Sequence, residues 1–313
     1  MDLIATLRDR IDALEEGEYI PGLRAVLLHV ETAFRHLSRG RKESDETAFT
    51  DAIYRTNQAF EGSIKEAFRV LAGKDPAKMT PFEIEAYLEK NGIFRIRVLK
   101  LFTNYRTEWR NPSTHDYKLD FDESEAFLAI VSVTAFACLL LDEISERLSF
   151  LKSKAKTESL RGKLPHRISE PEMDLMNELT RAIQEYVASR QPVFSDSPET
   201  ESQVIGALHG FLTAALPDVQ IITEAQLAED RPFRADLLIR FGDEVVVLEV
   251  KRRFLRKNYQ NALAQVEHHM MLGNVKNGML LFLPEKAGEL VAEENIVKGI
   301  GGRMIVLKPR EEA

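Results

Sequence analysis

The sequence has only one cysteine, Cys138, among its 313 residues. A single cysteine excludes an intrachain disulfide and a cysteine-rich zinc site, so a reducing compartment suits the chain. Positive charge is also scarce, because 50 acidic side chains outnumber 42 lysines and arginines and give a formal net charge of -8. This balance argues against a protein that coats nucleic acid through general positive charge, and it is compatible with an enzyme that has local basic patches.

Long apolar runs are rare as well. The most apolar stretch covers residues 126–141, is flanked closely by acidic residues, and is short for a membrane span. We expect a buried helix of a bundle there. The first 19 residues alternate charged and apolar positions at helical spacing and lack the uninterrupted apolar core of a signal peptide. The sequence therefore predicts a cytoplasmic protein that has no contact with a membrane.

Apolar residues make up 44% of the chain, which is ample for packed cores, and the length is typical of two domains. In residues 1–150 the apolar positions recur at helical spacing, which predicts an all-α helical bundle. Residues 80–83 combine Thr, Pro and Glu in the order of a capped helix start. Pro112 predicts that a later helix ends at Asn111, because proline removes a donor and restricts the residue before it.

The pattern changes in the second half of the chain. Residues 151–195 are predicted to be a basic linker followed by a connecting helix at about residues 171–189. Residues 196–313 are predicted to be an α/β domain with the order αβββαβ, a further strand and a mixed sheet. Its expected strands are residues 219–224, 234–241, 245–250, 278–283 and 304–307, and its second helix is residues 258–272.

Two acids and a lysine of this second domain meet the needs of metal-dependent phosphodiester hydrolysis. That chemistry requires hard oxygen ligands that leave room for water and phosphate, and a cation near the reacting oxygens. Glu249 and Lys251 project from one face of an extended segment, while Val250 points to the other face and offers its carbonyl as a ligand. Asp236 lies on the preceding segment. Taken alone, the tripeptide Glu249-Val250-Lys251 is more simply a strand end that reaches solvent beside a salt bridge. The order of the surrounding elements favours a metal site instead.

That order, with ADLLIRFGDEVVVLEVK at residues 235–251, resembles the PD-(D/E)xK restriction-endonuclease-like superfamily over about residues 196–309. The resemblance implies a nuclease that uses Mg²⁺ or Mn²⁺ and acts on DNA or RNA. Arg234 and Ala235 stand in place of the family's proline and leave the metal ligands intact. By this resemblance the catalytic residues are Asp236, Glu249, Lys251 and Gln265, and the metal ligands are Asp236, Glu249, the Val250 carbonyl and Glu201.

Some of these assignments compete with plainer ones. Glu201 lies three residues before Val204 on a buried helical stripe, so its carboxylate can face the sheet, and Glu199 is the competing choice. Gln265 is equally compatible with an ordinary surface glutamine. The neighbouring His268 and His269 are expected to be ordinary helix residues. A basic run that follows the site is predicted to bind phosphates, through Arg252, Arg253, Arg256 and Lys257.

In the helical half, Arg110 and His115 flank the sequence Asn-Pro-Ser-Thr at an expected helix end followed by a loop. Arginine offers a planar fork of donors for a phosphate, and histidine both accepts and gives a proton near neutral pH. Cleavage of RNA by its own 2′-hydroxyl needs a group that binds the phosphate and a group that transfers protons, and it needs no metal. Taken by itself, the pair is more simply a capping arginine and an exposed loop histidine.

The stretch YRTEWRNPSTHDYKLDFDESEAFLAIVSV at residues 105–133 resembles the HEPN domains of prokaryotic defence and toxin systems, over about residues 20–150. The resemblance implies a homodimer in which each protomer contributes Arg110 and His115 to a metal-independent endoribonuclease site. The motif is an arginine and a histidine with four residues between them, and an asparagine directly after the arginine is its specific form. Asn111 holds that position and is a predicted nucleic-acid contact. Glu61 matches an acidic position of some members, although a solvated helix face explains it equally well. Some HEPN domains only dimerise or bind.

Three functions therefore compete. The preferred one is a two-domain defence nuclease, in which a HEPN half dimerises and cuts RNA and the other half is a metal-dependent endonuclease. The second is a restriction-like or repair-like endonuclease whose HEPN half is a non-catalytic dimerisation or sensing module. The third is a non-enzymatic regulator that binds nucleic acid. The paired carboxylates count against the third, because they would repel phosphate.

Overall fold

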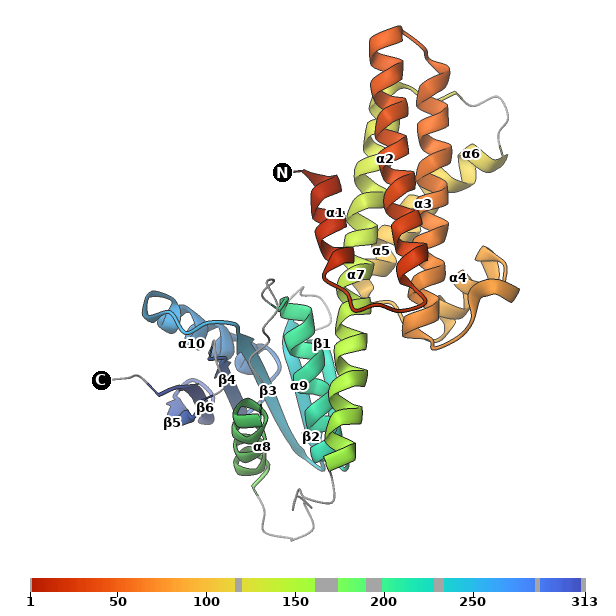
Figure 1. Cartoon of the computed structure of the whole chain (residues 1–313). Coiled ribbons are helices and arrows are strands. Elements are labelled where there is room, and N and C mark those ends of the chain that lie inside the picture. Colours follow the sequence, from red (N-terminus) through yellow and green to blue (C-terminus); the bar gives the residue numbers. More distant parts are fainter. Residues whose placement is uncertain are drawn as a thin grey trace. The chain divides into compact units, whose positions relative to one another are not determined.

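The computed structural model divides the chain into two compact units, Met1–Arg147 and Leu148–Ala313. The first unit is helical, and the second contains a six-stranded mixed sheet flanked by helices (Figure 1). The prediction of a helical half followed by a half with a mixed sheet is therefore confirmed. The structure describes residues 2–115, 120–160, 174–189, 199–227, 234–284 and 288–310.

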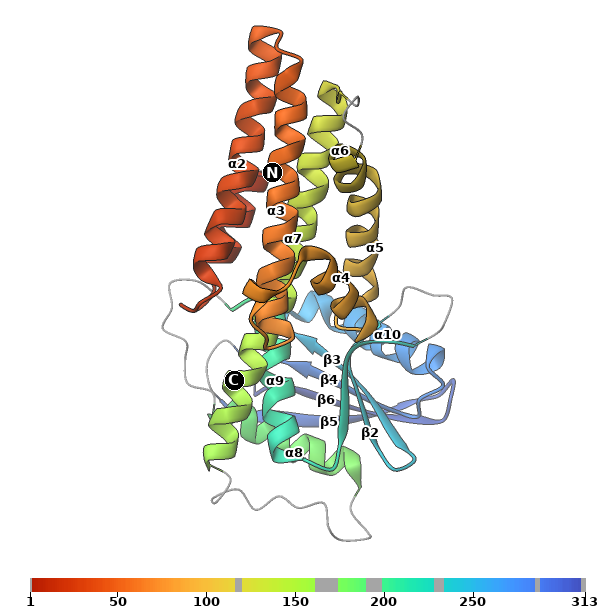
Figure 2. The same ribbon diagram turned by 90° about the vertical axis from the view of Figure 1, so that its right-hand side faces the viewer.

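The helices of the first unit pack around a core rich in aromatic side chains. Phe60 lies at its centre, with its ring 4.6 Å from the Tyr105 ring and 5.1 Å from the Phe136 ring, centroid to centroid. The long helices α2 and α3 run beside one another, with α7 next to them (Figure 2). The bounds are α1 Leu3–Asp12, α2 Ile20–Glu43, α3 Thr47–Leu71, η1 Pro76–Lys78, α4 Pro81–Lys90, α5 Ile96–Tyr105, η2 Arg106–Arg110, α6 Asn111–His115 and α7 Glu123–Leu160.

The predicted capped start of α4 is confirmed. Thr80 Oγ1 accepts a hydrogen bond from the Glu83 backbone N–H at 3.3 Å. The Glu83 carboxylate in turn accepts one from the Thr80 N–H at 2.7 Å. Each residue therefore satisfies a donor that the first helical turn would otherwise leave unpaired.

The predicted helix end at Asn111 is wrong. Helical backbone continues from α5 through the wide π-helical turn η2 into α6, so Arg110 and His115 both lie on helical backbone. In the wide turn the Asn111 N–H donates to the carbonyl of Arg106, five residues earlier. A regular helix would bring the ring of Pro112 against the carbonyl four residues before it, and the wider turn displaces that carbonyl.

The predicted linker differs from the structure in two ways. Residues 151–160 are the last turns of α7, and their leucines, three lysines, one alanine and one glutamate are good helix formers. These turns pack closely on α9 (Glu201–Ala215), where a Cβ on Gly210 would stand 2.3 Å from the Phe150 carbonyl oxygen. The helix assigned to the connection is α8 (Leu175–Ser189), and it belongs to the core of the second unit. The rest of the predicted linker lies outside the described residues.

Within the part of the chain that the structure describes, α7 is the one helix long and apolar enough to cross a membrane. Half of its most apolar 18-residue window is buried inside the structure. Ala126, Ile130, Val133 and Phe136 are fully buried on this helix. A core helix meets the same criteria of length and composition, as expected for the apolar stretch at residues 126–141.

The sheet of the second unit has the strand order β1-β2-β3-β4-β6-β5. The pairs β3–β4 and β4–β6 are parallel and the other three pairs are antiparallel. All five predicted strands are present, and β5 is the one that the sequence analysis missed. Its bounds and those of the elements around it are β1 Gln220–Gln226, β2 Arg234–Phe241, β3 Glu244–Lys251, α10 Arg256–Leu272, β4 Asn277–Phe282, β5 Leu290–Val297 and β6 Gly302–Pro309.

Helices cover both faces of this sheet. On one face α8 and α9 pack against Leu237 and Ile239 of β2 and Val246, Leu248 and Val250 of β3. On the other face α10 packs against β4 and β6. Because side chains alternate along a strand, the remaining residues of β3 face α10. The sheet thereby presents Glu249 and Lys251 on the face that α10 covers.

Candidate functional site

The β2–β3 hairpin opens at the predicted acidic pair. Backbone pairing of the two strands ends at Leu237 and Leu248, although both strands continue beyond these residues. The N–H of Val250 therefore donates to a side chain, Asp236 Oδ2, at 2.8 Å. The N–H of Asp236 in turn donates to Glu249 Oε1 at 3.4 Å. The two carboxylates lie in the mouth of a splayed hairpin and replace its missing backbone bonds.

The other side of Asp236 is also irregular. Register between β1 and β2 passes from Thr223–Leu237 to Ala225–Ala235 and omits the residue opposite Asp236, which is Glu224. The backbone of Glu224 is left-handed, with φ 44°, a conformation that non-glycine residues seldom adopt. Asp236 thus occupies a position where the sheet is interrupted towards both neighbouring strands.

Glu249 is the most deeply buried acid of this site, with 1% of its surface exposed. A buried carboxylate is costly unless donors surround it. Gln265 Nε2 donates to Oε2 at 2.9 Å, and His269 Nδ1 lies 2.8 Å from Oε1. Lys251 Nζ is 3.5 Å from Oε2. The structure therefore brings Asp236, Glu249, Lys251 and Gln265 together, and it adds His269.

Burial and the neighbouring charge of Glu249 raise the pKa of Asp236 to about 7. The Val250 N–H and the Lys251 ammonium lower this pKa, and the charge of Glu201 raises it further. The two carboxylates thus repel each other at the pH at which both are ionised. A divalent cation between them would remove this repulsion, so the donor set fits Mg²⁺ or Mn²⁺.

Of the two candidate glutamates before the sheet, Glu201 is the first residue of α9 and is exposed. Glu199 precedes the helix, and Thr200 caps it by accepting from the Gln203 N–H. The charge of Glu201 is among the causes that raise the pKa of Asp236. No group of three or more His, Cys, Asp or Glu side chains is assembled as a metal site within the described residues. Asp236, Glu249 and the Val250 carbonyl are the groups that would hold a cation in the hairpin, and Glu201 stays a predicted ligand.

The predicted phosphate-binding residues all lie on the surface beside this site. Arg252 and Arg253 follow β3, and Arg256 and Lys257 form the first turn of α10. The residue before α10, Leu255, provides no side-chain cap. Two cations at the positive end of a helix macrodipole are unfavourable by themselves, and an anion bound there would offset the charge.

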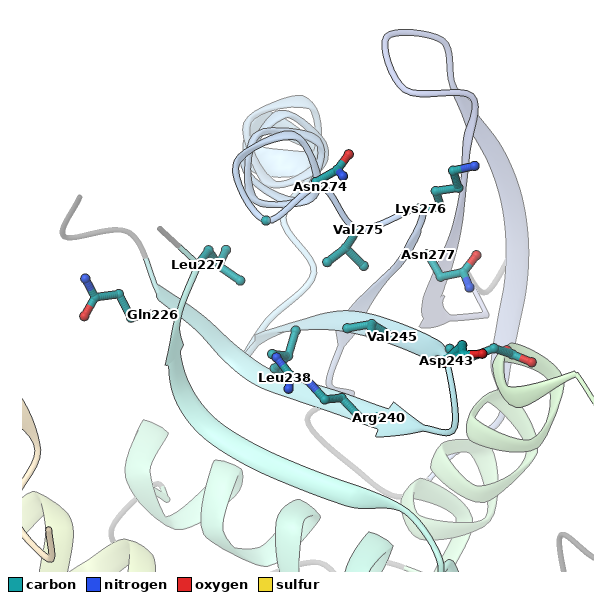
Figure 3. A pocket seen from close by; sticks show the side chains of 12 residues that line it. Gln226, Leu227, Leu238, Arg240, Asp243, Val245, Asn274, Val275, Lys276 and Asn277 are labelled. Atoms are coloured by element: carbon teal, nitrogen blue, oxygen red, sulfur yellow. The ribbon is translucent and has the colours of Figure 1, made fainter. Parts of the chain in front are cut away.

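A pocket of about 420 Å³ lies elsewhere on the face of the sheet that α10 covers (Figure 3). Its floor is apolar and includes Leu238, Val245 and Val275, and its rim carries Arg240 and Lys276. It lies at the turn end of the β2–β3 hairpin, away from the splayed mouth. None of the residues that line it is a predicted site residue.

The helical unit holds the second candidate site. Arg110 Nη2 lies 3.6 Å from Glu61 Oε1, and Arg110 Nη1 donates to Asn111 Oδ1 at 3.2 Å. Arg110 Nε is buried and, among the described residues, has no hydrogen-bond partner. Burial raises the pKa of the nearby Glu85, and the charges of Arg110 and Arg106 lower it. The His115 side chain lies outside the described residues.

A buried polar network fixes the backbone beneath Arg110. Asn57 Nδ2 donates to Ser113 Oγ at 2.7 Å, and Ser113 Oγ donates to the Arg110 carbonyl at 3.1 Å. The Tyr105 hydroxyl oxygen lies 2.7 Å from Thr56 Oγ1 and 3.1 Å from Asn57 Oδ1, and its one proton serves these two acceptors. These bonds join α3 to both sides of the wide turn. The position of Arg110 is therefore set by buried polar contacts as well as by packing.

Sequence reasoning missed His269, which was expected to be an ordinary helix residue. The signal was present, since Gln265 and His269 are four residues apart and therefore share one face of α10. His268 next to it is exposed. No family model matches the chain, and neither a curated protein nor a solved structure matches it.

Proposed function

We propose that the second unit is a metal-dependent endonuclease of the prokaryotic defence type, with the restriction-endonuclease-like fold that its sequence resembles. The observation that supports it is the pair of carboxylates in the mouth of the splayed hairpin, with the pKa of Asp236 raised to about 7. Such a perturbed pKa beside a specific charge partner is typical of functional sites. A non-enzymatic regulator of nucleic acid has no use for it.

Each residue of the site then has a role. Asp236, Glu249 and the Val250 carbonyl would hold the cation, and Glu201 would add negative charge at the outer edge. The bound cation would polarise the phosphate and activate a water molecule. Lys251, whose ammonium lies 3.5 Å from Glu249, stabilises the negative charge that develops on the reacting phosphate. Gln265 holds Glu249 through its amide.

The substrate enters this proposal through its phosphates. The exposed cations at the start of α10 lie directly after the strand that carries Glu249 and Lys251. Contacts of this kind position a nucleic acid without reading its sequence. The acidic chain thus concentrates positive charge where a phosphodiester would bind. The residues assigned to these contacts are Arg252, Arg253, Arg256 and Lys257.

Lys251→Met should slow metal-dependent cleavage by about 10²- to 10³-fold, the usual effect of removing one group that stabilises developing charge. The variant keeps the apolar stem of the side chain, so its fold and its Mn²⁺ affinity should stay close to those of wild type. The measurement is digestion of labelled DNA and RNA with Mg²⁺, with Mn²⁺ and with chelator. Lys276→Met is the matched control, because Lys276 is an exposed lysine at the far end of the same unit. Undiminished cleavage by Lys251→Met would contradict the assignment.

We further propose that the helical unit is a HEPN-type module that dimerises and cuts RNA without metal. The observation that favours this second activity is the half-buried Arg110, whose buried Nε has no hydrogen-bond partner within the described residues and whose acidic neighbours are Glu61 and Glu85. An arginine held in one orientation by such contacts can present its outer donors to a phosphate. Asn111 accepts from Arg110 and fixes this orientation.

A homodimer is the expected oligomeric state, because a HEPN-type site requires Arg110 and His115 from two protomers. A two-fold axis would bring both copies to one RNA strand. Light scattering on the full chain between about 1 and 50 µM should give twice the chain mass of 35.6 kDa. A mass of one chain throughout this range would exclude a composite site and leave the second unit as the source of any nuclease activity.

A further inference from the structure

The contact between α10 and Glu249 goes beyond the proposed set of ligands. His269 has 4% of its surface exposed, and its Nδ1 lies 2.8 Å from Glu249 Oε1. A carboxylate in its ionised form only accepts hydrogen bonds, and in that form this contact requires Nδ1 to donate. One helical turn earlier, Gln265 Nε2 donates to the other oxygen at 2.9 Å. Both oxygens of a buried acid are therefore held by one face of one helix.

This arrangement fixes the plane of the carboxylate. Each carboxylate oxygen offers about two lone-pair positions. The close donor on each oxygen comes from α10, whereas the Asp236 N–H and Lys251 Nζ make the longer contacts, at 3.4 Å and 3.5 Å. A cation would therefore compete with the two longer contacts and leave those of α10 in place. A leucine at position 269 would fill the space equally well as packing but would leave Oε1 without this donor. The histidine is therefore explained by the acid that it contacts rather than by the core that surrounds it.

The helix that carries the two donors is firmly seated. Val266 and Met270 of α10 are fully buried against the sheet. Gly278 of β4 allows a close approach, since a Cβ there would stand 2.4 Å from Met270 Sδ and 3.0 Å from Val266 Cγ1. A donor on a rigid, close helix holds its acceptor in one place, which is what a metal ligand requires.

We infer that His269 is a positioning residue for Glu249, which it holds together with Gln265 in the orientation that binds the divalent cation. The inference rests on the proposed function, because it assigns Glu249 to the metal. It predicts that the affinity for the cation depends on the donor at position 269, although His269 itself does not touch the cation.

The test is calorimetric titration of the full chain with Mn²⁺. His269→Leu should weaken Mn²⁺ binding by about 10- to 100-fold, the usual effect of losing a group that orients a metal ligand. His269→Asn places an amide N–H near the position of Nδ1 and should restore most of the affinity. His268→Leu is the matched control, because this neighbouring side chain is exposed, and it should bind like wild type. Melting curves without metal establish that each variant is folded.

Equal Mn²⁺ affinity for wild type and folded His269→Leu would overturn the inference and make His269 a packing residue. Failure of folded His269→Asn to bind more tightly than His269→Leu would also overturn it, because the donor would then not be the cause. Nitrogen hyperfine coupling to Mn²⁺ in the wild-type electron spin echo spectrum would make His269 a direct ligand instead. If wild type binds no Mn²⁺ at all, the proposed function fails, which is a result distinct from the first three.

Discussion

Asp236→Asn should abolish metal-dependent cleavage and yet make the metal-free protein more stable than wild type at pH 8. The loss of activity follows from the loss of a charged ligand, since an amide oxygen binds Mg²⁺ or Mn²⁺ more weakly than a carboxylate. The gain in stability follows from the site itself. At pH 8 the pH is above the raised pKa of Asp236, and the asparagine removes the charge that Asp236 would place beside Glu249 in the splayed hairpin.

The sign of the pH dependence follows from the direction of this shift. The pKa of Asp236 is raised from its usual 3.8 to about 7 in the folded protein, so between these values the folded state holds a proton that the unfolded state has lost. The free energy of unfolding of wild type therefore falls as pH rises through that window. At roughly 1.4 kcal/mol per pKa unit the full difference corresponds to about 4 kcal/mol. We expect about 2 kcal/mol, because water at the open mouth screens part of the repulsion.

Urea denaturation in chelator at pH 5 and at pH 8 measures this effect. The advantage of Asp236→Asn over wild type should be small at pH 5 and about 2 kcal/mol at pH 8. Added Mn²⁺ should reverse the order, because the cation stabilises only the protein that binds it. Asp243→Asn is the control, since Asp243 is an exposed acid in the turn of the same hairpin and should show no such crossover. A variant that is less stable than wild type at pH 8 would show that the two carboxylates do not repel.

The elements of the second unit were predictable because their signals are local. The run Val245–Leu248 is apolar at every position, which indicates a strand covered on both faces, and the structure places it at the centre of the sheet. β5 was missed because it has no such local signal. It is an edge strand with exposed Val291 and Ile296 and acidic residues between them, so no alternation of buried and exposed positions marks it in the sequence.

The candidate site was predictable in its residue types and not in its geometry. Spacing alone placed Glu249 and Lys251 on one face, but the splaying of the hairpin depends on contacts with Asp236 that join residues 13 and 14 positions apart. The role of His269 depends on how closely α10 approaches β4, which Gly278 decides. Tertiary contacts of this kind leave no periodic pattern along the chain.

The wide turn before α6 shows the same limit in the helical unit. Proline correctly indicates that a regular helix is disfavoured, but it does not say whether the chain leaves the helix or widens it. Here the buried hydrogen bonds of Asn57 and Tyr105 hold the chain against α3 on both sides of the turn. The helix therefore widens into η2 and does not end. Arg110 therefore lies within continuous helical backbone, where a helix end followed by a loop had been expected.

The two proposed activities should separate by metal. Cleavage of RNA through its 2′-hydroxyl needs a proton acceptor, a proton donor and positive charge, all of which paired Arg110 and His115 supply, so it should survive chelator. Hydrolysis at the second site depends on carboxylates, which bind phosphate only through a bridging cation, so chelator should stop it. His115→Ala should slow the chelator-resistant cleavage of RNA by about 10²- to 10⁴-fold and leave the metal-dependent cleavage unchanged.

Glu249→Gln should do the reverse. Glutamine keeps an oxygen that accepts from one of the two donors on α10, whereas alanine would leave both Gln265 and His269 buried without an acceptor. The experiment assays both variants on labelled RNA and DNA, with Mn²⁺ and with chelator, so that each variant is the control for the other. If both variants lose the same activity, there is one active site rather than two. If wild type has no chelator-resistant activity on RNA, the helical unit is a scaffold, and the protein is a single-activity endonuclease with a dimerisation or sensing module.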